Sequence, residues 1–195
     1  MPLPVLHALR CTGAASPTRL GAFTGLDEPD VESALITLGV EGFVTRSYGA
    51  WALTEAGRTE NVRRVAAELD AAGARGSLRA GFERFLALNP ELLDLCTAWQ
   101  LRLADGTSSA NDHTDPAYDA RVVDRFADLD RRFAPVGAEL AAALPRFGRY
   151  RLRLTGALER AVAGEPEFLT DSTASYHTIW AELHEDLLVT LGLPR

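Results

Sequence analysis

Short helical signals, each ended by a glycine, fill the first 42 residues, and this rapid punctuation constrains the fold more than any other feature of the chain. The expected ends are Gly13, Gly25 and Gly42. Ser16 and Pro17 predict the start of the second helix, because serine caps helix N-termini and proline suits the first helical position. We therefore expect three short helices in succession.

The third helix has the apolar spacing i, i+3, i+4, i+7 of an amphipathic helix. Its apolar residues are Val31, Ala34, Leu35 and Leu38. A β-prone run over residues 43–47, a turn at Tyr48 and Gly49, and a second run over residues 51–53 predict a small hairpin. Three helices followed by a hairpin are the order of a winged helix-turn-helix domain, and we expect a further helix from Thr54 to about Gly73.

The glycines at positions 73 and 76 mark the expected domain boundary, which divides the chain into residues 1–76 and 77–195. From residue 77 onward we predict helices alone. Asn89 and Pro90 are expected to end one helix and start the next, and Asp115 before Pro116 to start a helix that runs to about Arg132. The predicted fold class is therefore mainly α, an N-terminal winged helix with a small hairpin wing followed by an all-α domain.

Two segments, LGVEGFVTR (residues 38–46) and WALTEAGR (residues 51–58), resemble the winged-helix regulators of the MarR and PadR kind. The resemblance covers residues 3–57 and implies a domain that binds DNA. The segments FLALNPELLDLCTAWQ, NDHTDPAYD and SYHTIWAELHEDLL are similar to a group of actinobacterial proteins described as transcriptional regulators, and this similarity implies no ligand or reaction. MarR proteins have a dimerising helix ahead of the winged helix, so the order here is closer to that of PadR or GntR regulators.

The charge of the predicted DNA-binding domain is acidic. Residues 1–60 contain four arginines against seven carboxylates, a net charge of minus three, and four of the carboxylates lie at the start of the third helix. DNA affinity depends on cationic groups that neutralise phosphates, so we expect weak binding unless the arginines gather on one side. Acidic residues in a first helical turn stabilise the helix by about 0.3 to 1 kcal/mol each, which explains their position without a role in recognition.

Six residues are candidates for DNA contact, because hydroxyl groups can bond to phosphates or base edges and a wing arginine can enter the minor groove. They are Arg19 on the second helix, Ser33, Ile36 and Thr37 on the third, and Arg46 and Tyr48 on the wing.

An aromatic and polar mixture in the second domain suggests a small-molecule effector pocket between helices. The candidate residues are Trp99, Gln100, Asn111, Asp112, His113, Tyr118, Tyr176, His177, Trp180 and His184. The same residues are equally consistent with a structural network that joins the polar loop to the last helix. For Trp180, core packing is the favoured interpretation, because it shares a helical apolar stripe with Leu183 and Leu187.

No metal site, cofactor or enzymatic activity is predicted. His177 and His184 are separated by about 10 Å along a helix, too far for both to bind one ion directly. An alternative metal site would combine His113, Asp112 and a C-terminal histidine. The two cysteines form no CxxC pair, and Cys96 lies on an apolar stripe, which predicts an inert core residue. GxSxG, Walker and GxGxxG motifs are absent from the sequence, so a metal-dependent or hydrolytic helical domain is the less favoured alternative.

Together these patterns predict a cytoplasmic, homodimeric, one-component transcription regulator. Its winged helix would bind DNA, and its helical domain would dimerise and bind a small-molecule effector. No stretch reaches the roughly 20 apolar residues that a membrane helix needs, so no membrane association is expected. The alternative is a protein-interaction module that has the winged-helix shape but little affinity for DNA.

Overall fold

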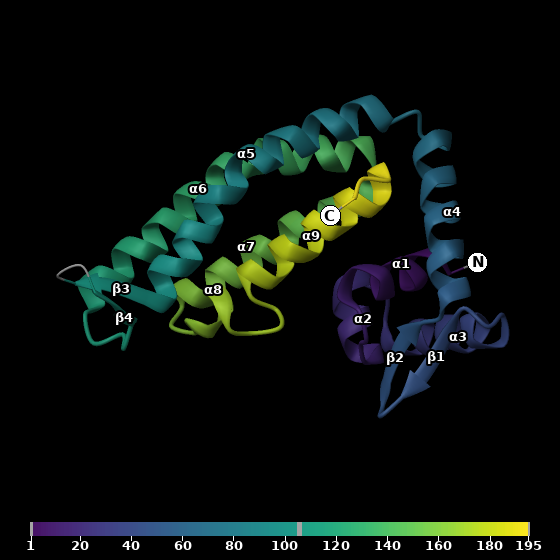
Figure 1. Cartoon of the computed structure of the whole chain (residues 1–195), viewed down its shortest axis with the longest axis horizontal. Coiled ribbons are helices and arrows are strands. Elements are labelled where there is room, and N and C mark those ends of the chain that lie inside the picture. The colour runs from purple at the N-terminus through teal and green to yellow at the C-terminus, as the bar shows by residue number, and fades with distance from the viewer. Residues whose placement is uncertain (1, 105–106, 195) are drawn as a thin grey trace. The chain divides into compact units, whose positions relative to one another are not determined.

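The computed structural model describes residues 2–104 and 107–194 and is mainly helical, with two small antiparallel hairpins (Figure 1). The chain divides into two compact units. Met1–Arg75 and Glu182–Arg195 form the first unit, and Gly76–Ala181 forms the second. The first break falls one residue before the expected boundary at residue 76. The C-terminal segment, which we expected in the second domain, belongs instead to the first unit.

The elements of the first unit follow the predicted order. They are α1 (Leu3–Thr12), α2 (Pro17–Thr24), α3 (Glu28–Val40), β1 (Val44–Ser47), β2 (Ala50–Leu53) and α4 (Glu55–Ala71). Helices α2, α3 and α4 each have an N-cap residue whose side chain accepts a hydrogen bond from a backbone N–H of the first turn. These N-cap residues are Ser16, Asp27 and Thr54 respectively. The local capping signals in the sequence thus predicted these starts correctly.

The hairpin is joined to the start of the domain by a short bridge. Strand β1 pairs with β2 in the register Val44 to Leu53, and the backbone of Ala15, between α1 and α2, exchanges two hydrogen bonds of 2.9 Å with Trp51. Helix α1 packs against α2, α3 and α4, and α3 lies beside β1 (Figure 1). Val31, Leu35 and Leu38 of the apolar stripe of α3 are fully buried in the resulting core, and Ala34 is half-buried.

The second unit contains a hairpin that the sequence analysis did not predict. Its elements are α5 (Arg75–Gln100), β3 (Leu101–Ala104), β4 (Thr107–Ala110), α6 (Pro116–Ala143), the 3-10 turn η1 (Pro145–Phe147), α7 (Gly148–Val162), α8 (Glu167–Thr170) and the first part of α9 (Tyr176–Leu191). The expectation of an all-α second domain is therefore wrong, because β3 and β4 pair over the segment that we assigned to a helix end and a polar loop.

Two helices also continue through prolines at which we expected breaks. Helix α5 contains Pro90 and α6 contains Pro135. Asn89 does not cap a new helix, because its side-chain oxygen accepts a 3.0 Å hydrogen bond from the indole of Trp180 on α9. Packing along α5 and α6 outweighs the local cost of the prolines, which is about 3 kcal/mol in a helix interior.

Aromatic side chains fill the core of the second unit. The ring of Trp180 lies 4.7 Å from that of Phe85 on α5 and 5.0 Å from that of Phe133 on α6, measured between ring centroids. Tyr176 stacks on the other side of the cluster, 6.1 Å from Trp180. The predicted core role of Trp180 is thus confirmed, and α9 supplies this core before it continues into the first unit at Glu182.

Candidate functional site

The outer face of α3 and the tip of the β1–β2 hairpin carry five of the six predicted DNA contacts. Ser33, Ile36 and Thr37 are exposed on α3, and Arg46 and Tyr48 are exposed on the hairpin. Tyr48 lies at the turn with a positive φ of 49°, which directs its side chain fully into solvent. Ser33, Ile36 and Thr37 point outward because the apolar residues on the opposite face of α3 are buried in the core.

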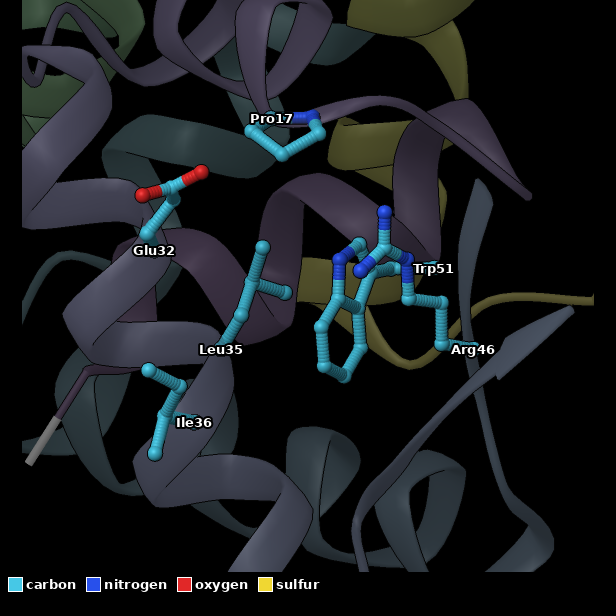
Figure 2. A pocket seen from close by; sticks show the side chains of 6 residues that line it. All are labelled: Pro17, Glu32, Leu35, Ile36, Arg46 and Trp51. Carbon is cyan, nitrogen blue, oxygen red and sulfur yellow. The ribbon is translucent and has the colours of Figure 1, made fainter. Parts of the chain in front are cut away.

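A shallow groove of about 210 Å³ lies between α3 and the hairpin. Its lining consists of Pro17, Glu32, Leu35, Ile36, Arg46 and Trp51 (Figure 2). The guanidinium of Arg46 lies beside the Trp51 indole, 5.8 Å from the ring centroid, and Ile36 projects from α3 at the edge of the groove. The groove therefore combines one cation, one carboxylate and an apolar floor.

Most arginines of the first unit are bound to carboxylates of the same unit. The pairs are Arg10 with Glu185, Arg19 with Glu182, Arg58 with Glu55, Arg63 and Arg64 with Glu60, and Arg75 with Asp70. Arg46 differs, since the contact of its guanidinium is with the face of an aromatic ring. Positive charge available to a phosphate is therefore concentrated at the hairpin.

Arg19, the sixth predicted DNA contact, is half-buried and engaged within the fold. Its guanidinium lies 3.2 Å from the carboxylate of Glu182, which is 5% exposed. A charge already compensated by a buried carboxylate contributes little to phosphate binding, because the ion pair would have to open first. Arg19 is thus engaged in an ion pair inside the fold, whereas the other five predicted DNA contacts are exposed.

The ten predicted effector residues do not form one site. One group gathers at the β3–β4 hairpin, where the amide of Asn111 donates to the carbonyl oxygen of Trp99 and to Asp119, both at 3.0 Å. His113 lies 3.0 Å from the same carboxylate and packs on the Trp99 ring, 4.5 Å away. The Tyr118 hydroxyl donates to the backbone of α5. Gln100 accepts from the backbone of the same loop. These contacts form a structural network that joins the loop to α5 and α6, whereas the network that we expected would join the loop to the last helix.

A second group lies in the aromatic core. Asn89, which binds Trp180, precedes Trp99 by ten residues on α5, so the two sites are separated by about 15 Å along the helix. Tyr176 donates to Asp130 at 3.1 Å, and Arg151 pairs with the same carboxylate. His177 is half-buried on α9.

His184 belongs to the first unit, whereas the other nine residues belong to the second. The alternative metal site is not assembled in the described residues either. The carboxylate of Asp112 accepts a 3.1 Å hydrogen bond from the N–H of Thr114, and the ring of His113 binds Asp119. Cys96 is buried, and this burial raises the pKa of its thiol to about 12, as expected for an inert core cysteine.

A hollow of about 330 Å³ lies next to the hairpin of the second unit. Its described lining is Asp94, Thr97, Ala98, Leu101, Arg102, Ser108 and Tyr118. Tyr118 is the one predicted effector residue in this lining, and Arg102 lies over its ring, 4.6 Å from the centroid. The hollow therefore presents a guanidinium and an aromatic face, but without the other residues that we expected to share it.

A buried polar cluster in the first unit was missed by the sequence analysis. His7 on α1 binds Asp186 on α9 through Nε2 at 2.9 Å, and Cys11 lies one helical turn from His7. The i, i+4 spacing of His7 and Cys11 was the available signal, because it places both side chains on one face of a helix. Asp186 could not be found in this way, since 179 residues separate it from His7.

Comparison of the chain with protein-family models, with curated proteins and with solved structures gave no match. Within residues 2–104 and 107–194, no helix combines the length and the apolar character required to cross a bilayer.

Proposed function

We propose that the first unit is a winged helix that binds duplex DNA with the outer face of α3 and the β1–β2 hairpin, and that the chain is a transcription regulator. The observation that carries this proposal is the shared exposure of Ser33 and Thr37 on α3 and of Arg46 on the hairpin. A helix that enters the major groove needs small polar residues on its outer face, and an adjacent arginine suits a phosphate or a narrow minor groove.

The carboxylates of α3 are compatible with this function. Asp27 caps the helix by accepting from the N–H of Asp30 at 3.0 Å, and Glu28 and Asp30 occupy the first turn, where a negative charge stabilises the helix dipole. Glu32, by contrast, lies in the groove itself. Because Arg46 is the main cation on this face, we expect a small electrostatic contribution and therefore low non-specific affinity.

The second unit would form a dimer and so bring two copies of the DNA-binding unit together. Leu86 and Leu93 are exposed on α5, seven residues apart and so on nearly the same side of the helix. An exposed apolar stripe of this kind favours self-association. The hollow next to Tyr118 would be the place for an effector, with Arg102 suited to an anionic or aromatic ligand.

The test measures binding of the full chain to a random duplex library and to the DNA upstream of its own reading frame, by fluorescence anisotropy over a range of salt concentrations. We expect selective retention of some sequences, with an affinity that falls as salt rises. Replacement of Arg46 by alanine should reduce the slope of log affinity against log salt by about 0.9, the value for one phosphate contact.

Arg75→Ala is the matched control. It removes the same charge from the same unit, but at the first residue of α5, beyond the far end of α4, which is about 25 Å long. Its salt slope should equal that of the unaltered chain. A chain that retains no duplex at about 50 mM salt, or that binds equally well without Arg46, would refute the proposal.

A protein-interaction module is the second candidate, and a specific observation favours it. On the same face, Ile36 is 63% exposed and Val40 is 86% exposed, and Tyr48 extends fully into solvent. Aromatic and aliphatic side chains of this kind are common at the centre of protein interfaces. Absence of DNA binding, together with one protein that is captured by the chain and lost with Ile36→Asp, would support this function instead.

A further inference from the structure

Three side chains with metal-binding atoms converge inside the first unit. His7 and Cys11 lie one turn apart on α1, and Asp186 reaches them from the part of α9 that belongs to the same unit. His7 is 3% exposed and Asp186 is 1% exposed, whereas Cys11 is half-buried. The cluster is thus closed on the side of the core and more open on the side of the sulfur.

The distances fit one small ion. The Sγ atom of Cys11 lies 3.6 Å from Nε2 of His7, and Nε2 lies 2.9 Å from Oδ1 of Asp186. All three donor atoms lie within 4.8 Å of one another. In a tetrahedral zinc site with bonds of about 2.0 to 2.3 Å, neighbouring ligand atoms are about 3.3 to 3.6 Å apart. The sulfur and the imidazole already have this separation, and the distance between the imidazole nitrogen and the carboxylate oxygen would have to grow by about 0.4 Å.

The arrangement differs from that of a catalytic cysteine. In a nucleophilic relay, the sulfur and the carboxylate face different nitrogens of the imidazole, so that a proton passes across the ring. Here both Cys11 and Asp186 face Nε2 of His7. The sulfur of Cys11, the carboxylate oxygen of Asp186 and Nε2 of His7 therefore lie around one point in space, as the ligands of a metal ion do.

A second layer of polar groups supports two of the three ligands, His7 and Asp186. The amide of Asn61, a fully buried residue on α4, faces Nδ1 of His7 with both its nitrogen, at 3.2 Å, and its oxygen, at 3.4 Å. This one side chain can therefore satisfy either tautomer of the ring. The hydroxyl of Thr190 donates to Asp186 at 2.9 Å. Such outer partners orient metal ligands and fix their protonation.

We propose that His7, Cys11 and Asp186 bind one divalent transition-metal ion, and that zinc is the metal that suits them best. A thiolate, an imidazole and a carboxylate are all zinc ligands, and the combination excludes magnesium and calcium, which prefer oxygen alone. Three protein ligands leave a fourth position for water or another ligand on the more open side of the cluster.

Binding changes the protons of the site in a defined way. The Cys11 thiol loses its proton to solvent as the metal–sulfur bond forms. The ring proton of His7 moves from Nε2, where the metal binds, to Nδ1, where it is donated to the oxygen of Asn61. The ion would then connect α1 to α9, which joins two segments 179 residues apart in the sequence. This proposal does not depend on whether the unit binds DNA.

The experiment uses the full chain without an affinity tag, treated with chelator and then titrated with cobalt(II) and zinc(II). We expect one cobalt ion per chain and a thiolate-to-cobalt charge-transfer band in the near ultraviolet, which an equivalent of zinc abolishes. Cys11→Ser should lose the band. Cys96→Ala, which removes the other cysteine, should keep it. Asp186→Asn should weaken binding by about tenfold or more.

A measurement on the unaltered chain guards against variants that fail to fold. Zinc should slow alkylation of Cys11 by iodoacetamide about tenfold or more, as followed by peptide mass spectrometry. Absence of the cobalt band in the unaltered chain, its persistence in Cys11→Ser, or alkylation of Cys11 at an unchanged rate would each overturn the assignment.

Discussion

The hydroxyl of Tyr176 lies 3.1 Å from Oδ1 of Asp130, and both residues are buried in the core of the second unit. Arg151 pairs with the same carboxylate, so the three side chains join α6, α7 and α9. A buried carboxylate is stable only with partners of this kind, and removal of a partner leaves a desolvated polar group behind. The arrangement gives Tyr176 a structural role in this core.

We expect Tyr176→Phe to lower the free energy of unfolding by about 1 to 2 kcal/mol, because Asp130 loses a hydrogen bond in the core. Asp130→Ala should be more destabilising, since it leaves both the tyrosine hydroxyl and Arg151 without the carboxylate. Urea unfolding followed by tryptophan fluorescence measures both effects. Equal stability of Tyr176→Phe and the unaltered chain would contradict this role.

The same hydrogen bond predicts a dependence on alkaline pH. Burial and the charge of Asp130 raise the pKa of Tyr176 well above its ordinary value of about 10. The neutral hydroxyl is thus favoured in the folded state, so its stabilising contribution is complete below about pH 10 and is lost as the pH rises above that value. The urea midpoint of Tyr176→Phe should therefore fall less steeply above this pH than that of the unaltered chain.

Gly57 predicts a strict requirement at the junction of the hairpin and α4. A Cβ atom at this position would lie 1.9 Å from the carbonyl oxygen of Phe43, which accepts a 3.0 Å hydrogen bond from the N–H of Thr54. Gly57→Ala must therefore displace backbone, and we expect a loss of about 2 kcal/mol or more in the free energy of unfolding.

Gly156 is the matched control for this substitution. It lies within α7, and a Cβ atom there would meet nothing within 4 Å. Gly156→Ala should stabilise the chain by about 0.5 to 1 kcal/mol, the ordinary gain in a helix interior. Thermal unfolding distinguishes the two, and a similar shift for both would contradict the close approach of Gly57 to Phe43.

The first unit also contains a carboxylate whose titration should be visible in acid. Hydrogen bonds from Arg63 and Arg64 lower the pKa of Glu60 from 4.5 to about 2. Since the folded pKa is the lower one, the stabilising contribution is present above about pH 4.5 and is lost as the pH falls towards about 2. Glu60→Gln should flatten the pH dependence of the unfolding temperature in this range. Glu55→Gln, at an exposed residue on the same helix, should change it less.

Dimerisation is predicted to depend on α5. The double substitution Leu86→Glu and Leu93→Glu places two charges on its exposed apolar stripe, so we expect the chain to become monomeric in sedimentation experiments. Leu152, which is 75% exposed on α7, provides the control, and Leu152→Glu should leave the mass unchanged. A monomeric unaltered chain, or dissociation by the control substitution, would rule out this interface.

The sequence predicted the elements of residues 1–75 well because their signals are local. Ser16, Asp27 and Thr54 each cap a helix through contacts with residues three positions away. The β3–β4 hairpin was missed because Leu101 and Leu103 extend the apolar stripe of the preceding helix. In the sequence, the dipeptide Asp105-Gly106 is itself a strong hairpin signal.

The candidate sites were harder to predict, because they depend on contacts between distant segments. Charge counts alone predicted that residues 1–60 are acidic. They could not show that Arg19 is bound to Glu182, which lies 163 residues away in the sequence. The ten proposed effector residues are alike in being aromatic or polar, but they do not lie in one place. Hydrophobic periodicity predicts which face of a helix is buried, but it does not predict which other helix packs against that face. Whether the outer face of α3 binds DNA stays a prediction.

The division of α9 has a practical consequence for dissection of the chain. A fragment that ends at Arg75 would lack Glu182–Arg195, and with it the partners of His7, Arg10 and Arg19. It would also lack Leu183 and Leu187, which are fully buried in the intact chain. A synthetic peptide of residues 182–194 should restore the folded unit by complementation, because two segments far apart in the gene encode this one unit.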